Sequence, residues 1–149
     1  MLVKELCTGD VVCCGPRSTV LEAARLMRHK HVGDVVIVDD PDWQRVPLGV
    51  VTDRDLVMEV LANGRDATTT TLADIARTPV VIARETEDAG AVAERMRTHG
   101  VRRIPVVDER GALVGIVTLD DLLKALLSEM HALVEAQGRA QRREQSARR

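Results

Sequence analysis

Two stretches of the sequence decide the fold: VGDVVIVDD at 32–40 with PLGVVTDRDLV at 47–57, and GVRRIPVVDERGALVGIVTLDDLL at 100–123. Each stretch holds two valine-rich runs, and the second run ends in a threonine that is followed by acidic residues. β-Branched side chains suit buried strands, whereas the residues after the threonine show apolar positions at helical spacing. Each stretch therefore predicts two strands and a helix within an α+β (mixed α/β) fold.

These stretches belong to a longer internal repeat. An offset of 69 residues aligns the first parts of the two copies, and an offset of 66 aligns their last parts, because the first copy has three extra residues. The matched pairs include Val3 with Leu72, Leu6 with Ile75, Met27 with Met96, Val38 with Val107, Gly49 with Gly115, Thr52 with Thr118 and Asp55 with Asp121. Agreement at two constant offsets over most of residues 3–127 indicates a duplication.

Each copy is predicted to form a β-α-β-β-α unit. The expected strands are 11–14, 35–38 and 48–52 in the first copy and 80–83, 104–107 and 113–118 in the second; the expected first helices are 20–30 and 89–99. Gly33 and Gly100 follow these helices, where a left-handed residue commonly ends a helix.

The chain divides into residues 1–62 as repeat 1, 63–71 as a linker, 72–130 as repeat 2, and 131–149 as a helix extension with a basic, disordered tail. One copy of about 60 residues buries too little surface to be stable by itself. We therefore expect the two copies to pack sheet to sheet with pseudo-two-fold symmetry, which leaves a cleft at the seam as a natural ligand site.

Composition narrows the class of protein. The chain has no Phe or Tyr and one tryptophan, Trp43, so it lacks the aromatic platforms of single-strand nucleic-acid binders. A net charge of −2 gives no general attraction to nucleic acid or to anionic membranes. No run approaches the roughly 20 apolar residues of a membrane span, and the first residues do not resemble a signal peptide. We expect a cytoplasmic protein whose three cysteines stay reduced.

The C-terminal tail is strongly basic. Its charged residues are Arg139, Arg142, Arg143, Arg148 and Arg149, against Glu144. A frayed, solvated end is one interpretation. An electrostatic contact with an acidic partner, including a nucleic acid, is the other.

Catalytic and metal-binding patterns are missing from the sequence. It has no nucleophile elbow, Walker loop or dinucleotide-binding glycine pattern, and no base, nucleophile and orienting partner converge. His29 and His31 are two residues apart, so they do not share a helix face, and no cysteine or acidic pair completes a ligand set. We therefore expect neither an enzyme nor a metal site.

The repeated stretches resemble the cystathionine-β-synthase (CBS) domain pair, or Bateman module, of the stand-alone type. The resemblance covers nearly all of the chain except the C-terminal tail, with both copies in register. It implies a tandem CBS fold that binds AMP, ADP, ATP or an S-adenosyl compound such as S-adenosylmethionine as a regulatory ligand, with no required cofactor. It also implies a dimer that couples ligand occupancy to a downstream protein in signal transduction.

The pattern Thr-x-x-Asp occurs at the end of the last strand of each copy, as Thr52 with Asp55 and Thr118 with Asp121. The resemblance assigns these residues to a ribose site: the carboxylate can accept bonds from two vicinal hydroxyls, while the threonine and the helix N-terminus address ribose or phosphate. The same pattern is also a helix capping box that needs no ligand. Thr71 in the linker begins a third example, which we interpret as a cap only.

The two sites are predicted to differ in charge. Arg102 and Arg103 precede a strand of repeat 2, at positions where the family often presents basic side chains to phosphate, whereas repeat 1 has Gly33 and Asp34 there. The site of Thr118 and Asp121 should therefore bind charged nucleotides more tightly, although Arg54 offers positive charge to the other site. The alternative is that both arginines are solvated surface residues.

Adenine needs an apolar slot. By family position its candidates are Val80, Val101 and Ile104, with Thr78 and Pro79 at the entry; ordinary core packing explains the same residues equally well.

Two functions compete with ligand sensing. The first is a ligand-free structural module that docks through its last helix, whose apolar stripe exceeds what one copy needs and favours a symmetric homodimer. The second is a nucleic-acid contact made by the basic tail. The net charge of −2 makes the nucleic-acid contact the less favoured interpretation.

Overall fold

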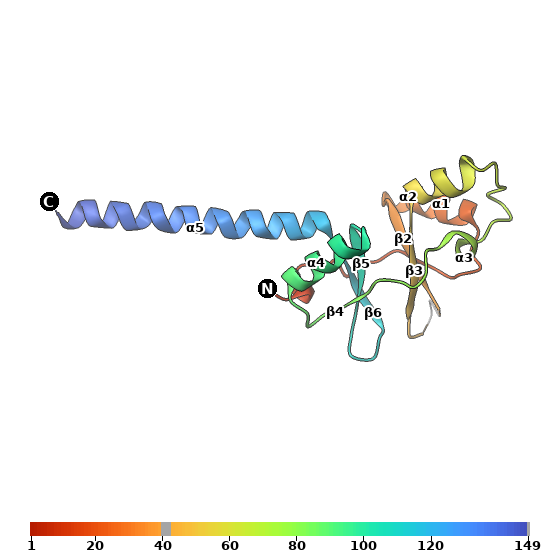
Figure 1. Cartoon of the computed structure of the whole chain (residues 1–149), viewed down its shortest axis with the longest axis horizontal. Coiled ribbons are helices and arrows are strands. Elements are labelled where there is room, and N and C mark those ends of the chain that lie inside the picture. The colour runs from red at the N-terminus through yellow and green to blue at the C-terminus, as the bar shows by residue number, and fades with distance from the viewer. Residues whose placement is uncertain (40–42, 149) are drawn as a thin grey trace.

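The computed structural model describes residues 1–39 and 43–148, so Arg149 of the basic tail lies outside the described residues. Two three-stranded sheets form the body, in the orders β1-β2-β3 and β4-β5-β6 (Figure 1). The strands are β1 (Cys13–Cys14), β2 (Asp34–Val38), β3 (Pro47–Thr52), β4 (Ala83–Arg84), β5 (Arg103–Val107) and β6 (Leu113–Thr118). In each sheet the first pair is parallel and the second is antiparallel, so the duplication predicted from the sequence extends to the topology.

A matching helix follows the first strand of each repeat. These two helices are α1 (Val20–Lys30) and α4 (Ala89–His99), and both have the predicted bounds. Thr19 and Glu22 form a capping box that stabilises the start of α1. Gly100 ends α4 at φ 63°, as expected, but His31 at φ 55° ends α1 in place of Gly33. Helix α1 ends at Lys30, three residues before Gly33, so the left-handed position falls on His31.

The closing helices differ between the repeats. In repeat 1, α2 (Asp53–Asp55) continues into the π-helical segment η2 (Leu56–Leu61). In repeat 2, α5 (Leu119–Ala147) is one helix of 29 residues that projects away from the body (Figure 1). Residues 131–149 were expected to form a helix extension and a disordered basic tail; the helix extension is present, and α5 stays helical through the described tail to Ala147. Helix-favouring Ala, Gln and Arg residues and an i,i+4 pair between Arg139 and Glu135 support the helix there.

Short segments are exchanged between the repeats. The 3₁₀-helix η1 (Val3–Glu5) precedes repeat 1, yet Val3 is fully buried in the core of repeat 2. Helix α3 (Leu72–Ile75) precedes repeat 2, yet Leu72 packs in the core of repeat 1 and its N–H donates to the carbonyl of Ser18 at 2.9 Å. The sequence units 1–62 and 72–130 are thus interleaved in space.

This exchange explains a difference in the first strand of each sheet. We expected strands at 11–14 and 80–83, whereas β1 and β4 have two residues each. The residues just before each of these strands lead in from the segment that packs on the other repeat, and only the last part of each run reaches its sheet.

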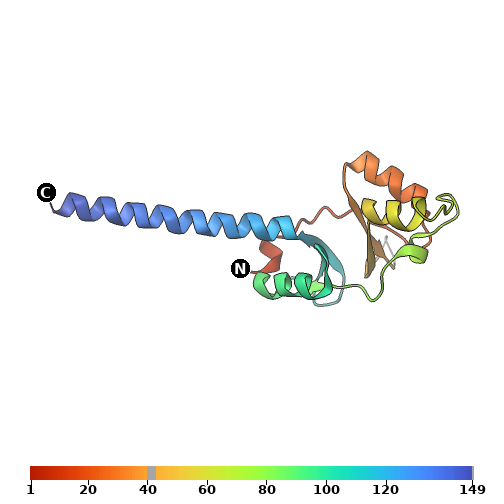
Figure 2. The same cartoon turned by 45° about the horizontal axis from the view of Figure 1, so that its top comes forward.

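The sheets face one another in the middle of the body and the helices cover their outer faces (Figure 2). The contact between sheets is a small apolar cluster of Val36, Val38, Leu113 and Ile116. At one end of this contact the Leu113 N–H donates to the carbonyl of Arg45 at 3.0 Å. Sheet-to-sheet packing, as predicted, therefore creates a seam between the repeats.

Candidate functional site

Both Thr-x-x-Asp patterns form complete capping boxes. The backbone N–H of Asp55 donates to Thr52 Oγ1 at 3.2 Å, and the N–H of Thr52 donates to Asp55 Oδ2 at 2.8 Å. The corresponding distances for Asp121 and Thr118 are 3.2 and 2.9 Å, and the Thr118 hydroxyl also donates to Asp121 Oδ2 at 2.7 Å. The capping function is therefore present at both positions, whatever else these residues do.

Each capping carboxylate keeps an uncommitted oxygen. Within the described residues, hydrogen bonds engage Oδ2 of Asp55 and Asp121, and none engages their Oδ1 atoms. Both aspartates are half-buried, whereas Asp74, which caps α3 through the same box with Thr71, is exposed. The two repeat carboxylates thus differ from the linker cap in being sheltered while still able to accept further bonds.

An ion pair crosses the seam beside these caps. Arg103 Nε lies 3.0 Å from Asp34 Oδ2, and the Arg103 guanidinium also donates to the carbonyl of Gly33 at 3.3 Å. Asp34 is the register partner of Thr52, and Arg103 is the register partner of Thr118. The two candidate threonines therefore lie at the same edge of the paired sheets, with Asp34 and Arg103 between them.

The surroundings of Asp34 disfavour the charged form of its carboxyl group. Burial raises the pKa of its carboxyl, Arg103 opposes that shift, and the nearby Asp53 adds to it. A carboxyl whose pKa is raised by folding favours the folded state at low pH and loses that contribution as pH rises through its folded pKa. At neutral pH the ionised Asp34 is therefore a cost that the Arg103 pair only partly offsets.

The other predicted residues spread around this edge. Arg54 and Arg102 are exposed, and Arg103 is half-buried in its pair with Asp34. Ile104 is fully buried in the core of repeat 2, so its packing role is established by the structure. Val101, a second slot candidate, packs against the same core, Val80 is half-buried, and the predicted entry residues Thr78 and Pro79 are exposed.

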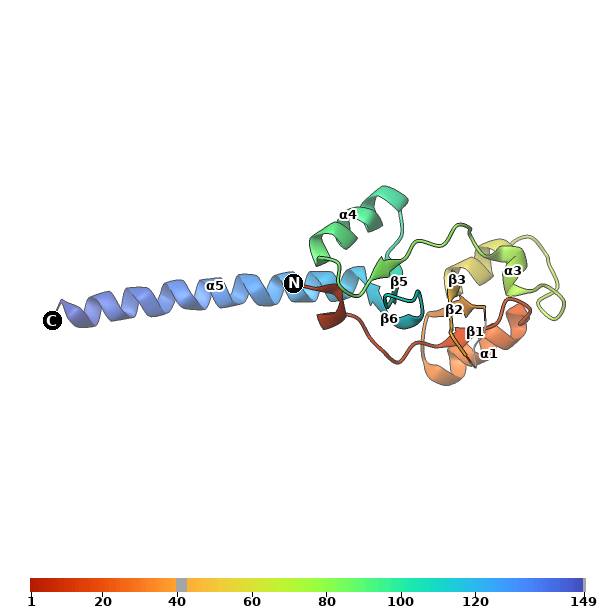
Figure 3. The same ribbon diagram turned by 90° about the horizontal axis from the view of Figure 1, so that it is seen from below.

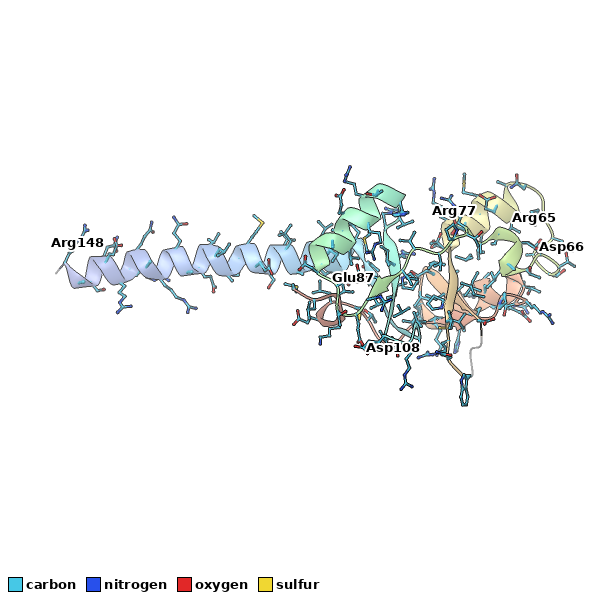
Figure 4. All side chains as sticks on the ribbon, turned by 60° about the horizontal axis from the view of Figure 1, so that its bottom comes forward. Arg65, Asp66, Arg77, Glu87, Asp108 and Arg148 are labelled. Atoms are coloured by element: carbon cyan, nitrogen blue, oxygen red, sulfur yellow. The ribbon has the colours of Figure 1, made fainter. Side chains whose placement is uncertain are left out.

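The segment before Thr78 lies against repeat 1. A Cβ on Gly49 of β3 would be 3.3 Å from Ala76 Cβ and 3.9 Å from the carbonyl of Arg77. Arg77 is labelled in Figure 4, above the β2–β3 sheet. The run Thr78–Val80 therefore follows directly from a contact with the strand that ends at Thr52.

In repeat 2 the equivalent segment is Cys7–Thr8, which was not among the predicted site residues. Thr8 pairs with Ile116 of β6 through two backbone hydrogen bonds of 2.9 Å, and Cys7 lies against Gly115. Burial raises the pKa of the Cys7 thiol, and the charge of Asp121 raises it further. The signal available in the sequence was the matched glycine pair 49 and 115, which marks close approach of another backbone.

Two surface hollows are lined by other residues. One of about 330 Å³ lies at Arg25, Arg28, His29 and His31. The other, of about 360 Å³, lies between α4 and the start of α5. Neither is lined by the Thr-x-x-Asp residues, so neither of these two hollows is the candidate site. Among residues 1–39 and 43–148 no three His, Cys, Asp or Glu side chains gather as a metal site.

A family model confirms the resemblance stated above. The model of the CBS domain matches residues 3–62 and again residues 72–128. The chain belongs to the CBS domain family. Its two matches form a tandem CBS pair, and its two mixed sheets with flanking helices have the fold expected for one.

Several curated proteins are similar to most of this chain. An uncharacterised protein of Methanopyrus kandleri is 37% identical over 122 residues, which cover 82% of this chain and 61% of that protein. Hypoxic response protein 1 of Mycobacterium tuberculosis is 34% identical over 132 residues, covering 89% of this chain and 88% of that protein.

Among solved structures, a CBS domain protein from Pyrobaculum aerophilum complexed with AMP has a TM-score of 0.74 at 29% identity, covering 89% of this chain and 99% of that chain. The CBS pair of protein MJ0100, in complex with 5′-methylthioadenosine and S-adenosylmethionine, has a TM-score of 0.73 at 26% identity, covering 87% and 98%. A hexameric CBS-CP12 protein from bloom-forming cyanobacteria has a TM-score of 0.72 at 29% identity, covering 83% and 69%. Adenosyl ligands and oligomers therefore occur among the structural neighbours of this CBS pair.

Proposed function

We propose that this CBS pair is a non-catalytic regulatory module that binds an adenosyl ligand, AMP, ADP, ATP or S-adenosylmethionine, at the shared edge of its two sheets. The observation that carries the proposal is the pair of half-buried carboxylates, Asp55 and Asp121, each with Oδ1 uncommitted. A carboxylate in this position accepts bonds from two vicinal ribose hydroxyls, while the preceding threonine and helix N–H groups face phosphate or sugar. Ligand complexes of the structural neighbours support the same assignment.

Thermal unfolding with AMP, ATP and S-adenosylmethionine tests this proposal. A ligand at 100 times its dissociation constant adds about 2.7 kcal/mol to the free energy of unfolding, which corresponds to a melting-temperature increase of roughly 5–10 °C. CMP serves as the control because it keeps the ribose and phosphate but lacks adenine. No shift with any of the three adenosyl compounds, or an equal shift with CMP, contradicts the proposal.

The site of Thr118 and Asp121 is proposed to prefer charged nucleotides. Arg102 is exposed and free to approach a phosphate, whereas Arg103 is shared with Asp34. Repeat 1 offers Arg54 on α2, but its neighbour Asp53 and the equivalent of Arg103, which is Asp34, are acidic. Loss of nucleotide binding should accordingly be larger for Asp121→Ala than for Asp55→Ala.

The substitution Asp34→Asn should tighten AMP binding. It removes a negative charge from the shared edge and releases Arg103 for a phosphate, which we expect to lower the dissociation constant roughly five- to tenfold. Adenosine is the matched ligand, because without a phosphate its affinity should stay unchanged. The free energy of unfolding at neutral pH should stay within about 1 kcal/mol of wild type. Calorimetric titration measures both affinities; equal effects on AMP and adenosine would contradict this role of Arg103.

Signalling to a downstream protein follows if the ligand binds one arrangement of the repeats better than another. The seam is small and its Asp34–Arg103 pair lies beside both candidate sites, so ligand occupancy and the relative placement of the repeats are physically linked. Within the described residues Cys7, Cys13 and Cys14 are free thiols, which is typical of a reducing compartment and supports a cytoplasmic location. No described helix has the length and apolar content needed to cross a bilayer.

Self-association is a second proposed function, favoured by the exposed apolar residues of α5. It corresponds to the structural-module interpretation of the sequence, and it is compatible with ligand binding.

A further inference from the structure

Arg103 and Asp34 form an ion pair between the two sheets, and no other ion pair joins the sheets in the described part of the chain. Figure 3 shows the sheet of β5 and β6 beside that of β2 and β3, with α5 leading away from the seam. The side chain of Asp34 is 20% exposed and that of Arg103 is 34% exposed. Charges sheltered in this way interact more strongly than charges in open solvent. A change of one charge at this point therefore acts on both repeats.

The carboxylate of Asp34 depends on Arg103 for its stabilisation. Burial raises the pKa of Asp34, Arg103 lowers it, and among the described residues no hydrogen bond lowers it further. Asp74 shows the contrast, because hydrogen bonds from Thr71 lower the pKa of that exposed carboxyl. A group that draws the positive charge of Arg103 away from Asp34 will therefore favour the protonated form of Asp34.

One further charged group faces Asp34. Asp53 of α2 adds to the rise in the pKa of Asp34, and Asp53 Oδ2 would lie 3.4 Å from a Cβ placed on Gly33. The carbonyl of Gly33 accepts the Asp53 N–H at 3.0 Å and the Arg103 Nη1 at 3.3 Å. Strand β3, which pairs with this end of β2, has no titratable residue, and β1 pairs with β2 only beyond this point. Two carboxylates thus share one guanidinium, and a third negative group adds an anion that Arg103 cannot also neutralise.

Arg103 also belongs to the candidate ligand site. It is the register partner of Thr118, and the side chains of register partners lie on the same face of a sheet, with their Cβ atoms about 5 Å apart. Its Nε lies against Asp34 and its Nη1 donates to Gly33, whereas its Nη2 makes no hydrogen bond within residues 1–39 and 43–148. A phosphate group bound beside Thr118 can approach this Nη2 edge of the guanidinium.

We propose that Asp34 takes up a proton when a phosphate-bearing adenosyl ligand binds beside Arg103, so that acidification strengthens binding and the CBS pair senses pH together with its ligand. This inference rests on the proposed adenosyl site. The negative charge of the ligand attracts Arg103 and repels the carboxylate, and a proton from solvent removes that repulsion. Affinity is then highest below the pKa of Asp34 in the free chain, and it falls to a lower plateau above the pKa of Asp34 in the complex. Adenosine, which has no phosphate, binds without proton uptake.

Calorimetric titration with adenosine 5′-sulfate, between about pH 5 and pH 7.5, tests the proposal across the range above the usual pKa of an aspartate. Phosphate monoesters lose their second proton near pH 6, whereas the sulfate ester keeps one negative charge throughout, so any proton taken up belongs to the protein. Wild-type affinity should rise roughly five- to tenfold from the high to the low end of this range. Heats measured in two buffers of different protonation enthalpy should show net proton uptake, and the affinity for adenosine should not change with pH.

Two variants locate the proton. Asp34→Asn should abolish the uptake and bind the sulfate ester equally well at both ends of the range, with an affinity close to that of the wild type at low pH. Asp53→Asn is the matched control, because it removes a charge that faces the same cluster but leaves the ion pair with Arg103 intact; its proton uptake should persist. Binding of the sulfate ester without proton uptake by the wild type, or with equal uptake by Asp34→Asn, overturns this inference while the adenosyl site stands. No binding of adenosine or of its sulfate ester at any pH contradicts the proposed function, and the inference with it.

The titration of Asp34 itself gives an independent readout. Carbon-13 NMR of the carboxyl groups follows each aspartate, and the signal of Asp34 is assigned by its loss in Asp34→Asn. Its titration midpoint should rise when adenosine 5′-sulfate is bound and stay unchanged when adenosine is bound. An unchanged midpoint in the presence of bound sulfate ester contradicts the proposal.

Discussion

The substitution Asp121→Asn is expected to weaken AMP binding at the preferred site by at least roughly 30-fold. The change keeps the size of the side chain but removes the charge and one acceptor, so two charge-assisted bonds to the ribose become at most one neutral bond. A loss of about 2 kcal/mol or more follows from the usual strength of hydrogen bonds to charged groups. Equilibrium dialysis with labelled AMP measures both the affinity and the number of sites, which should fall from two to one at intermediate concentrations.

Asp74→Asn is the control for this experiment. Asp74 accepts a 2.9 Å bond from the Thr71 N–H in the same capping box, but it is exposed in the linker and has no assigned ligand. Both variants should lose about 1 kcal/mol of folding free energy through the weakened cap. Binding should fall only in Asp121→Asn. If both variants bind AMP like wild type, Asp121 is a cap and nothing more.

Gly115→Ala is expected to have the largest effect on stability, lowering the free energy of unfolding by about 2 kcal/mol. A Cβ at this position would stand 2.8 Å from Cys7 Sγ and 3.0 Å from the carbonyl oxygen of Thr8. The Cys7 side chain can rotate away, but Thr8 is held to Ile116 by two backbone hydrogen bonds and cannot retreat without breaking them. Urea unfolding monitored by circular dichroism gives the value.

The other repeat supplies the matched comparison. Gly49 occupies the equivalent position, yet a Cβ there would be 3.3 Å from Ala76 Cβ and meet no closer backbone atom. Gly49→Ala should therefore cost less than about 1 kcal/mol. Adding Cys7→Ala to Gly115→Ala should recover only part of the loss, since the Thr8 oxygen remains. Equal costs at positions 49 and 115 would show that the close approach seen at β6 is not what makes Gly115 necessary.

Local signals explain what the sequence predicted well. Helix α1 was placed correctly because its apolar residues keep helical spacing. Strand β6 was placed correctly because a valine-rich run lies between Gly111 and the capping threonine 118. The duplication then allowed each copy to support the assignment of the other.

What the sequence did not predict depends on contacts between distant residues. Nothing near Val3 or Leu72 indicates that each belongs to the core of the opposite repeat. Asp34 and Arg103 were interpreted separately, one as repelling phosphate and one as attracting it, whereas the fold joins them in one ion pair. The charge available to a nucleotide is therefore a property of the seam between repeats and not of either repeat alone.

The most direct test is a calorimetric titration of the wild-type chain with AMP and with 2′,3′-dideoxy-AMP. If the half-buried carboxylates hold the sugar through its paired hydroxyls, AMP should give saturable heat and the dideoxy compound should bind at least tenfold more weakly. Absence of heat with AMP, ATP and S-adenosylmethionine at millimolar concentration, or equal affinity for the two AMP compounds, would contradict the proposed site.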